Sequence, residues 1–292
     1  MKVKKIHFIV NPISGGGKGK EVEKSIRKLF YDYNIEIKLT EKKNDAHDFA
    51  IKSYNEGADL IVSCGGDGTF NEVASALVNK DIPLAIVPIG SGNGLARHLK
   101  LPLNYEKALQ LILNSKMIIE KIDVGCLNEY FFFSNTGIGF DAEAVKVYSH
   151  QKQRQLIGYL KCVFLSIFQF KPVHLILNSD VYNFEGKAML LNISNSNCMG
   201  YDFTIAPQAS LKDGLLDVNL VKKCSWFKFL SIGLGFVVKK NFSKKQSYFK
   251  TNHLNVKTSS NGFIQLDGEY MALDTQELKI SILPQALNIL VS

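Results

Sequence analysis

The fold of this chain is decided by the stretch Gly65-Gly66-Asp67-Gly68-Thr69-Phe70-Asn71-Glu72. An apolar run with strand composition, residues 60–64, precedes it, and a helical pattern, residues 73–78, follows it. A strand that breaks into glycines and then starts a helix presents bare backbone N–H groups, a geometry that favours a phosphate. A tight turn that needs positive φ is the simpler alternative. The acids, hydroxyl and amide of the stretch suit phosphate, magnesium and ribose, so we interpret it as a nucleotide-binding loop.

Two more glycine-rich loops follow predicted strands. The first comes after the strand that ends at Val10 and reads Asn11-Pro12-Ile13-Ser14-Gly15-Gly16-Gly17-Lys18-Gly19-Lys20. The second comes after residues 84–89 and reads Gly90-Ser91-Gly92-Asn93-Gly94. The first loop lacks the GxxxxGK[ST] spacing of a Walker-type NTPase, and a flexible turn is the alternative interpretation. Because the carboxyl ends of parallel strands meet at one edge of a sheet, we expect all three loops to converge there.

Helices and strands alternate in the first part of the chain and give way to strands in the second. The first part predicts strands ending at residue 10 and at 35–40, 60–64, 84–89 and 117–124, with helices at 21–33, 45–56, 95–99 and 105–115. The second part predicts strands at 130–133, 173–178, 187–194, 215–221, 253–257, 263–266, 278–283 and 287–291, with helices at 142–170 and 226–240.

These patterns predict a two-domain fold. Residues 1–125 are expected to form an α/β nucleotide-binding domain, Rossmann-like, with a parallel sheet. Residues 126–276 are expected to form a β-rich antiparallel domain, and residues 277–292 to fold back onto the first domain. A chain of 292 residues is long enough for two cores.

The amino-acid composition limits the classes of function that fit the chain but does not identify one. The net charge of +8 allows polyanionic partners such as nucleic acid or an anionic membrane, but no nucleic-acid-binding signature is present. The five cysteines are scattered without a CxxC pair, which favours reduced thiols in a cytoplasm and disfavours a zinc site. The longest apolar stretches, 156–170 and 226–238, contain lysines and are shorter than the roughly 20 residues that span a bilayer, so we expect no transmembrane helix.

With the three loops and a late Leu266-Asp267-Gly268-Glu269 in view, the sequence resembles the diacylglycerol kinase catalytic family. It is most similar to the bacterial soluble lipid kinases related to sphingosine kinases. The run Gly65 to Thr69 is shared with NAD kinases and fixes only the superfamily, whereas Asn71-Glu72, the 90–93 segment and the late Asp-Gly-Glu are more specific. The resemblance implies a nucleotide-binding α/β domain followed by a β-rich domain.

The resemblance also implies roles for individual residues. ATP would be bound by Asn11, Pro12, Ile13, Ser14, Gly15, Thr40, Gly66, Asp67, Gly68, Thr69, Phe70, Asn71, Glu72 and Ser91. The magnesium ion of the nucleotide would be organised by Asp67, Asp123 and Asp267, largely through water, since Mg²⁺ dehydrates reluctantly. Glu269 is the candidate general base for a lipid hydroxyl, with Asp267 beside it. A turn residue at a strand end is the alternative for Asp123, and an Asp-Gly hairpin turn is the alternative for residues 267–268.

A second, structural magnesium is implied at residues 210–217. Its ligands would be the backbone oxygens of Ser210 and Leu215 and the carboxylate of Asp213, and an Asp-Gly turn without metal is an equal alternative. In the third loop, many bacterial members of the family carry an acid at the position of Gly94. The small residue found here looks more like sphingosine kinases. The acceptor therefore stays open between diacylglycerol and a sphingoid lipid.

The expected function is ATP- and Mg²⁺-dependent transfer of a phosphoryl group to a lipid hydroxyl in phospholipid metabolism. An NAD kinase-like enzyme and a nucleotide-binding regulator without catalysis are the alternatives. Expected partners are a membrane lipid at an anionic surface, no nucleic acid, and a second copy paired through an exposed sheet edge. The segment 226–245 mixes aromatic residues with lysines and suits peripheral membrane association of a cytoplasmic protein; a core helix followed by a solvated basic loop is the alternative.

Overall fold

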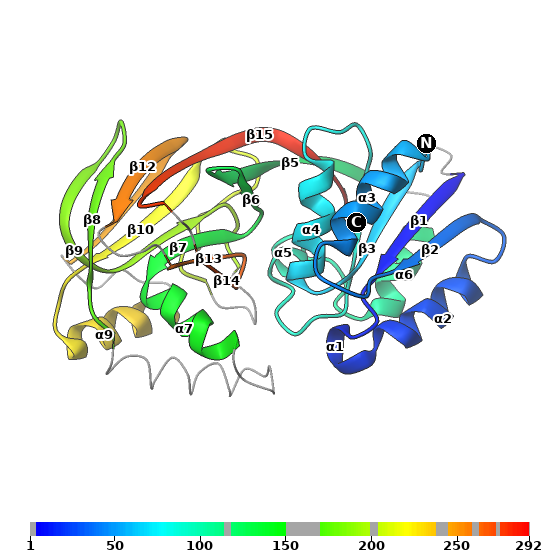
Figure 1. Ribbon diagram of the computed structural model, residues 1–292, viewed down its shortest axis with the longest axis horizontal. Helices are drawn as coiled ribbons and strands as arrows, with labels where there is room; N and C mark the ends of the chain where they lie inside the picture. Colours follow the sequence, from blue (N-terminus) through cyan, green and yellow to red (C-terminus); the bar gives the residue numbers. More distant parts are fainter. Residues whose placement is uncertain are drawn as a thin grey trace. The chain divides into compact units, whose positions relative to one another are not determined.

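The chain divides into two compact units, which Figure 1 draws in the colours of the sequence. A computed structural model describes residues 4–113, 118–149, 170–198, 204–237, 245–258, 263–272 and 275–291. Unit 1 comprises Met1–Val124 and Pro284–Ser292, and unit 2 comprises Gly125–Leu283. Both ends of the chain therefore belong to unit 1, and unit 2 is inserted between them.

Unit 1 is built on a parallel sheet. Its strands are β1 (Lys5–Val10), β2 (Asn34–Leu39), β3 (Leu60–Gly65) and β4 (Leu84–Pro88), in the order β2-β1-β3-β4. The last part of β15 (Glu277–Val291) runs parallel to β4, with Ile289 opposite Leu84. Its helices are α1 (Ser14–Gly17), α2 (Gly19–Leu29), α3 (Asp45–Asn55), α4 (Asp67–Leu77), α5 (Gly94–His98) and α6 (Tyr105–Leu113).

Helices cover both faces of this sheet. The side chains of β1 point alternately to one face and to the other. Ile6, Phe8 and Val10 join a buried cluster that includes Ile26 of α2 and Leu109 of α6. Because strand side chains alternate between faces, His7 and Ile9 point to the opposite face, against which α3 packs. The parallel order places the carboxyl ends of β1, β3 and β4 at one edge, where the three glycine-rich loops begin.

Unit 2 is antiparallel. Its strands are β6 (Tyr130–Phe132), β7 (Asn135–Gly139), β8 (Val173–Asn178), β9 (Asn183–Ser194), β10 (Leu216–Lys222), β11 (Gln246–Thr251), β12 (His253–Thr258), β13 (Phe263–Leu266) and β14 (Glu269–Ala272). They follow the order β14-β13-β7-β9-β8-β12-β15; β10 lies between β9 and β11, and β6 pairs with β5 (Ile118–Leu127). Unit 2 also has two helices, α7 (Phe140–Ser149) and α9 (Trp226–Val237). Phe140 of α7 and the buried side of α9 pack with Met189 and Leu190 of β9. Within the described ranges no helix has both the length and the apolar character to cross a bilayer.

The predicted fold class is confirmed: the N-terminal strands are parallel and those of the second part are antiparallel.

The two predicted final strands are in fact the single strand β15. Pro284 cannot donate a ladder bond, and Gln285, at φ 52°, gives its N–H to Asp123 Oδ1 at 2.8 Å, so the strand continues through this irregularity. Part of the helix predicted at 142–170, and residues 238–240 of the one at 226–240, lie outside the described residues.

Other elements were missed because their sequences lack strand composition. Strand β7 reads Asn-Thr-Gly-Ile-Gly, β11 is mostly polar, and β14 has four residues. The first glycine-rich loop contains the short segment α1 at Ser14–Gly17, within which Gly15 and Gly16 take positive φ and are not helical.

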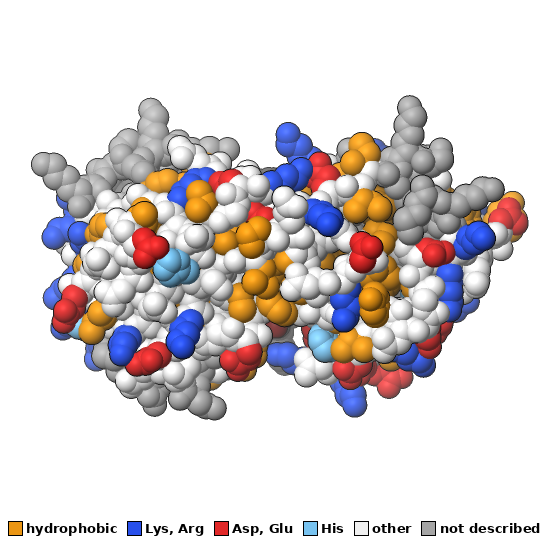
Figure 2. Space-filling model, turned by 90° about the horizontal axis from the view of Figure 1, so that it is seen from above, with side chains coloured by type: hydrophobic (Ala, Val, Ile, Leu, Met, Phe, Trp, Pro, Cys, Tyr) orange, Lys and Arg blue, Asp and Glu red, His pale blue; other side chains and the backbone are white. Residues whose placement is uncertain are grey.

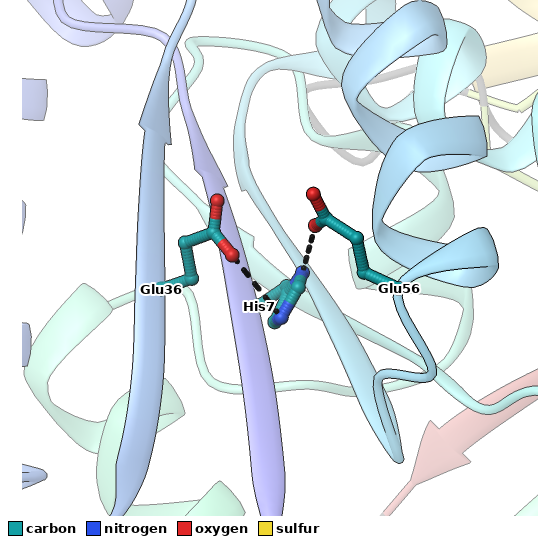
Figure 3. Close-up of side chains that lie close together, drawn as sticks. All are labelled: His7, Glu36 and Glu56. Atoms are coloured by element: carbon teal, nitrogen blue, oxygen red, sulfur yellow. Dashed lines mark ion pairs between the residues drawn. The ribbon is translucent and has the colours of Figure 1, made fainter.

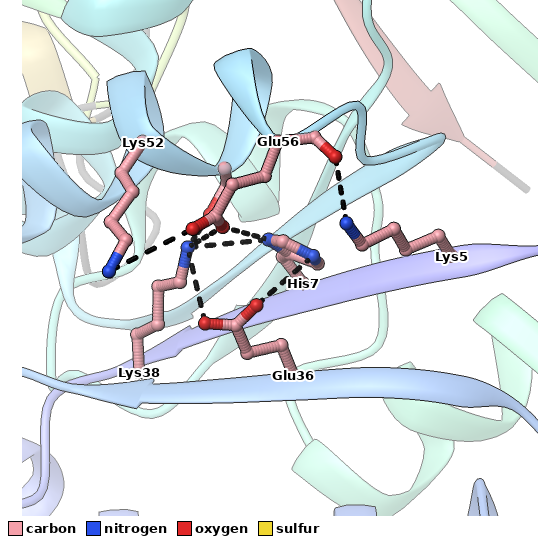
Figure 4. Close-up of polar contacts among 7 residues, drawn as sticks. Lys5, His7, Glu36, Lys38, Lys52 and Glu56 are labelled. Atoms are coloured by element: carbon pink, nitrogen blue, oxygen red, sulfur yellow. Dashed lines mark hydrogen bonds and ion pairs between the residues drawn. The ribbon is translucent and has the colours of Figure 1, made fainter.

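A buried polar cluster joins β1, β2 and α3. Ring nitrogens of His7, fully buried, lie 3.5 Å from a carboxylate oxygen of Glu36 and 3.6 Å from one of Glu56, as Figure 3 shows. One His and two Glu side chains this close could in principle hold a metal ion. Figure 4 shows that the ammonium of Lys38 lies among them instead, 2.6 Å from Glu56, 3.5 Å from Glu36 and 3.4 Å from His7 Nδ1. The cluster is therefore an ion-pair network that carries its own cation.

The protonation of this cluster follows from its surroundings. Burial, and then the positive charge of Lys38, lower the pKa of His7, so the imidazole is neutral and accepts from Lys38 at Nδ1. The hydrogen bond from Lys38 lowers the pKa of Glu56, which stays ionised. Lys38 also donates to the buried hydroxyl of Ser53 at 3.0 Å.

Replacement of Lys38 by methionine should destabilise unit 1. It leaves the buried acceptors Ser53 Oγ and His7 Nδ1 without their donor, which costs about 1–3 kcal/mol of unfolding free energy. Lys52→Met is the matched control, because Lys52 approaches the same Glu56 at 3.8 Å from a 63% exposed position. Urea unfolding should give a clear loss for Lys38→Met and almost none for Lys52→Met. Equal losses of unfolding free energy in the two variants would contradict a stabilising role of the buried Lys38 ammonium.

Candidate functional site

The loops after β1 and β3 are held together by Asn11. Its backbone N–H donates to Cys64 O at 3.0 Å, and its side-chain amide donates to Thr69 Oγ1 of α4 at 3.2 Å. Its side-chain oxygen accepts the N–H of Ile13 at 3.1 Å. The side chain of Asn11 therefore fixes the start of the first loop against the start of α4.

The loops after β3 and β4 touch through their backbones. A Cβ atom on Gly90 would lie 2.6 Å from Gly66 Cα, so residue 90 has no room for a side chain, and a Cβ on Gly66 would lie only 3.3 Å from Gly90 Cα. Gly65 O accepts the N–H of Ile89 at 2.9 Å. A Cβ on Gly15 would collide with Ile89 O, which places the first loop against the third. The structure thus brings the three predicted loops together in unit 1.

Asp67 links the second loop to the third. It is the first residue of α4, and its Oδ1 accepts the N–H of Gly94 at 2.8 Å. The third loop is shaped by Asn93, which has φ 51° and donates from its side chain to Gly90 O at 2.7 Å. Arg97 Nε donates to Gly92 O at 2.9 Å. Gly94, the residue for which the sequence analysis noted a likeness to sphingosine kinases, therefore donates its N–H directly to Asp67.

The converging loops fit the phosphates of a nucleotide. Gly66 is the N-cap of α4 and carries no side chain to cap it, so a ligand can meet the N–H groups of the first turn and the positive end of the helix dipole. Gly16 and Gly17, at φ 74° and 98°, face open space, since a Cβ on either would meet nothing within 4 Å. These are properties of a backbone-lined anion site.

The other predicted nucleotide residues of unit 1 differ in their exposure to solvent. Ile13, at 80% exposure, and Ser91 are open to solvent. Thr40 and Phe70 are buried, and Glu72 Oε2 accepts the N–H of Ala46 at the start of α3, at 3.2 Å. Burial of Phe70 and the bond from Glu72 to α3 show that both serve the packing of α4; their predicted contact with nucleotide stays a prediction.

Asp123 lies inside β5 and is almost completely buried, at 1% exposure. It is not a turn residue at a strand end, because β5 continues to Leu127. Its Oδ1 accepts the N–H of Gln285, the irregular residue of β15. This bond gives Asp123 a structural role, and its predicted role at magnesium stays a prediction.

Asp267 and Glu269 lie in unit 2, at the hairpin between β13 and β14. Asp267 and Gly268 form the turn, at φ 49° and 81°, and Glu269 pairs with Leu266 as the first residue of β14. The Asp267 carboxylate accepts three consecutive backbone N–H groups, those of Phe133, Ser134 and Asn135, at 2.9, 2.7 and 3.0 Å. The carboxylate is thus fixed by three donors, while the Glu269 side chain is exposed to solvent.

A buried polar network that the sequence analysis missed supports this turn. Gln265 Oε1 accepts the N–H of Gly268 at 3.0 Å, and Gln265 Nε2 donates to Asn135 Oδ1 and, at 3.5 Å, to Asp141 Oδ2. Asn192 Nδ2 reaches the same two acceptors. The sequence did carry a signal for this network. Asn192 interrupts an apolar strand, and a buried polar side chain there needs a hydrogen-bond partner.

Asp141 is the ionisable member of this network. It is the second residue of α7, is 6% exposed, and accepts the N–H of Ala142 at 2.9 Å. Burial raises its pKa to about 7, although the N–H of Ala142 and the amides of Asn192 and Gln265 act in the opposite direction. A Cβ on Gly137 would collide with its Oδ2, so a glycine is required beside it.

At the loop predicted to hold a structural magnesium, the ammonium of Lys250 lies beside Asp213. Asp213 Oδ2 lies 2.7 Å from Lys250 Nζ, and Asp213 Oδ1 accepts the N–H of Leu215 at 3.2 Å. Lys250 also donates to Gln208 O at 3.2 Å and lies 3.4 Å from the buried Asp217, which accepts from Tyr248. Both oxygens of Asp213 therefore have donors. The donor set fits the Asp-Gly turn without metal, with the ammonium as its cation.

Comparisons with known proteins agree along the whole chain. The family model of the diacylglycerol kinase catalytic domain matches residues 5–127, and that of the YegS C-terminal NAD kinase beta sandwich-like domain matches residues 134–291. The diacylglycerol kinase of Bacillus subtilis strain 168 is 29% identical over 277 residues, with 92% of this chain and 90% of the relative covered. The diacylglycerol kinase of Staphylococcus saprophyticus is 28% identical, with 91% and 89% covered.

Solved structures share the fold. One from Bacillus anthracis str. Sterne has a TM-score of 0.83 at 23% identity and covers 100% of this chain and 98% of its own. Another, a diacylglycerol kinase of the same organism, has a TM-score of 0.77 at 22% identity with the same coverage.

Removal of magnesium should leave the stability of the chain unchanged if Lys250 supplies the charge at Asp213. We expect the same thermal midpoint with EDTA and with excess Mg²⁺, in the absence of nucleotide. Lys250→Met should cost about 1–3 kcal/mol by leaving Asp217 and Asp213 without their cation. Lys257→Met is the control, since Lys257 is 58% exposed and pairs with Glu277 on the surface. A midpoint that EDTA lowers and Mg²⁺ restores would contradict the assignment.

The stability of the protein should respond to Asp141 near neutral pH. The folded protein keeps the Asp141 proton up to about pH 7, whereas the unfolded chain releases it near the usual value of 3.8. Folding therefore binds a proton in this window, and stability falls as pH rises through it, by at most about 1.4 kcal/mol per pH unit. Urea unfolding between about pH 5 and pH 8 should show this slope in the wild type and a smaller one in Asp141→Asn. Parallel pH profiles would contradict the raised pKa.

Proposed function

The chain belongs to the diacylglycerol kinase catalytic-domain family, and from this premise we propose that it transfers the γ-phosphoryl group of ATP, with magnesium, to the hydroxyl of a membrane lipid such as diacylglycerol or a sphingoid lipid. The chain is a kinase; the co-substrate, the metal and the acceptor are the parts proposed. The observation that carries the proposal is the meeting of three glycine-rich loops around Asp67 at the carboxyl edge of a parallel sheet.

Unit 1 supplies the groups that would hold the nucleotide. The first turn of α4 and the backbones around Gly66 and Gly90 suit phosphate oxygens, and Asn11 keeps the first loop in place. Asp67, whose Oδ1 is held by the N–H of Gly94, would hold the magnesium ion through water, which suits an ion that dehydrates reluctantly. When bound, the ion neutralises charge on the phosphates.

Unit 2 supplies the groups for the acceptor. Glu269 stands exposed on a turn that is fixed by the Asp267 carboxylate and by Gln265, so it is a positioned base. Its carboxylate takes the proton of the lipid hydroxyl as that oxygen forms a bond to the γ-phosphorus. The bond from the γ-phosphorus to the β–γ bridging oxygen breaks, and ADP leaves with the electron pair.

Phosphoryl transfer from labelled ATP tests the reaction class. The purified chain with Mg²⁺ should label a lipid from a total extract in micelles, and chromatography of the product identifies the acceptor. Label in NADP, when NAD is offered instead, would assign the chain to nucleotide phosphorylation. Clear ATP binding with no product from either acceptor would contradict the kinase proposal and favour a regulator.

Glu269→Gln should remove turnover while leaving ATP binding intact. Loss of a general base lowers kcat by about 10²–10⁴-fold, whereas the nucleotide groups proposed above lie in unit 1. Glu185→Gln, at an exposed glutamate on β9 of the same unit, should keep wild-type activity. Turnover would be measured with labelled ATP and binding by calorimetry. Equal loss of turnover and ATP binding would overturn the base assignment.

A further inference from the structure

The outer side of α9 is apolar. Phe227, Leu230 and Leu234 are 86%, 37% and 68% exposed. Their spacing of three and four residues places them on one side of the helix. The opposite side, with Phe229, Ile232 and Phe236, is buried in the cluster shared with β9 and β10. A surface helix normally presents polar residues outward, so an apolar outer side calls for a covering partner.

Lysines surround the start of this helix. Lys222 N donates to Lys245 O at 2.9 Å, and Lys223 N donates to Lys187 O at 2.7 Å, which brings three chain segments together there. Lys187, Lys223 and Lys245 are exposed, and Lys228 is exposed on the helix itself. Lys222 lies over the rings of Tyr182 and Phe184.

Near α9, the four exposed lysines named above are accompanied by an exposed acid on the same strand as Lys187. Glu185, on β9, is an exposed acid two residues from Lys187. On the face drawn in Figure 2, basic and acidic side chains are interspersed. Exposed lysines beside an exposed apolar strip match an interface that is anionic outside and apolar beneath.

We propose that α9 docks on an anionic lipid bilayer, with Phe227, Leu230 and Leu234 entering the acyl boundary and Lys187, Lys223, Lys228 and Lys245 meeting lipid phosphates. This proposal rests on the proposed lipid kinase activity, because an enzyme whose acceptor lies in a bilayer must reach its surface. The helix has 12 residues and is about 18 Å long, too short for a hydrocarbon core of about 30 Å. It therefore lies in the plane of the interface.

Vesicle sedimentation tests the docking surface directly. The full chain is mixed with phosphatidylcholine vesicles with and without phosphatidylglycerol. The wild type should bind the anionic vesicles, and Phe227→Gln with Leu234→Gln should weaken binding roughly tenfold or more. Lys223→Gln with Lys228→Gln should weaken binding and reduce its salt dependence. Val181→Gln, at a 60% exposed apolar residue in the β8–β9 turn, is the matched control and should bind normally.

A second readout separates docking from catalysis. Variants that keep the wild-type thermal midpoint are assayed with a short-chain, water-soluble diacylglycerol and with the same lipid in vesicles. Loss of activity only on vesicles supports the proposal. Vesicle binding through α9 by a chain that phosphorylates no lipid would contradict the proposed function and leave the docking surface standing. Wild-type vesicle binding by the α9 variants would overturn the proposal, as would a dimer that they abolish without any change in vesicle binding.

Discussion

The contact between the backbones of Gly66 and Gly90 is the constraint on which unit 1 depends. The two loops approach so closely that a single methyl group at residue 90 would have to displace the neighbouring chain. This approach allows Asp67, at the start of one helix, to accept the N–H of Gly94 at the start of another. The result is a proposed nucleotide site made mainly of backbone, in which glycines leave room for the loops to approach. Side chains such as Asn11 and Asn93 act by holding the loops in place.

In unit 2, side chains hold the turn that carries Glu269. The turn before Glu269 is fixed by a carboxylate that accepts three N–H groups and by a glutamine that belongs to a buried network. In both units the proposed functional acid is fixed: Asp67 is anchored itself, and Glu269 is carried on an anchored turn. The Asp-Gly hairpin and the functional interpretation of residues 267–269 are therefore compatible, because the hairpin presents Glu269.

The sequence allowed the fold class and the meeting of the three loops to be predicted, because strand composition, helical periodicity and glycine clusters are local signals. It did not allow β7 or β14 to be found, since their few residues gain stability from neighbouring strands rather than from their own composition. The network around Asp141 depends on contacts between Asn135, Asn192 and Gln265, which are far apart in the chain. The partner of Asp213 was equally hidden, because Lys250 follows it by 37 residues.

The return of the last strand has a consequence for how the protein is made. Ile289 lies beside Leu84, and Asn79 donates its N–H to Ala286 O at 2.7 Å, so residues near the end of the chain complete a sheet whose other strands come first. During synthesis, the apolar edge of β4 leaves the ribosome about 200 residues before its partner does. Unit 2 emerges in the interval and has its own core on which to fold. Unit 1 is therefore the first unit to be synthesised and the last to complete its fold.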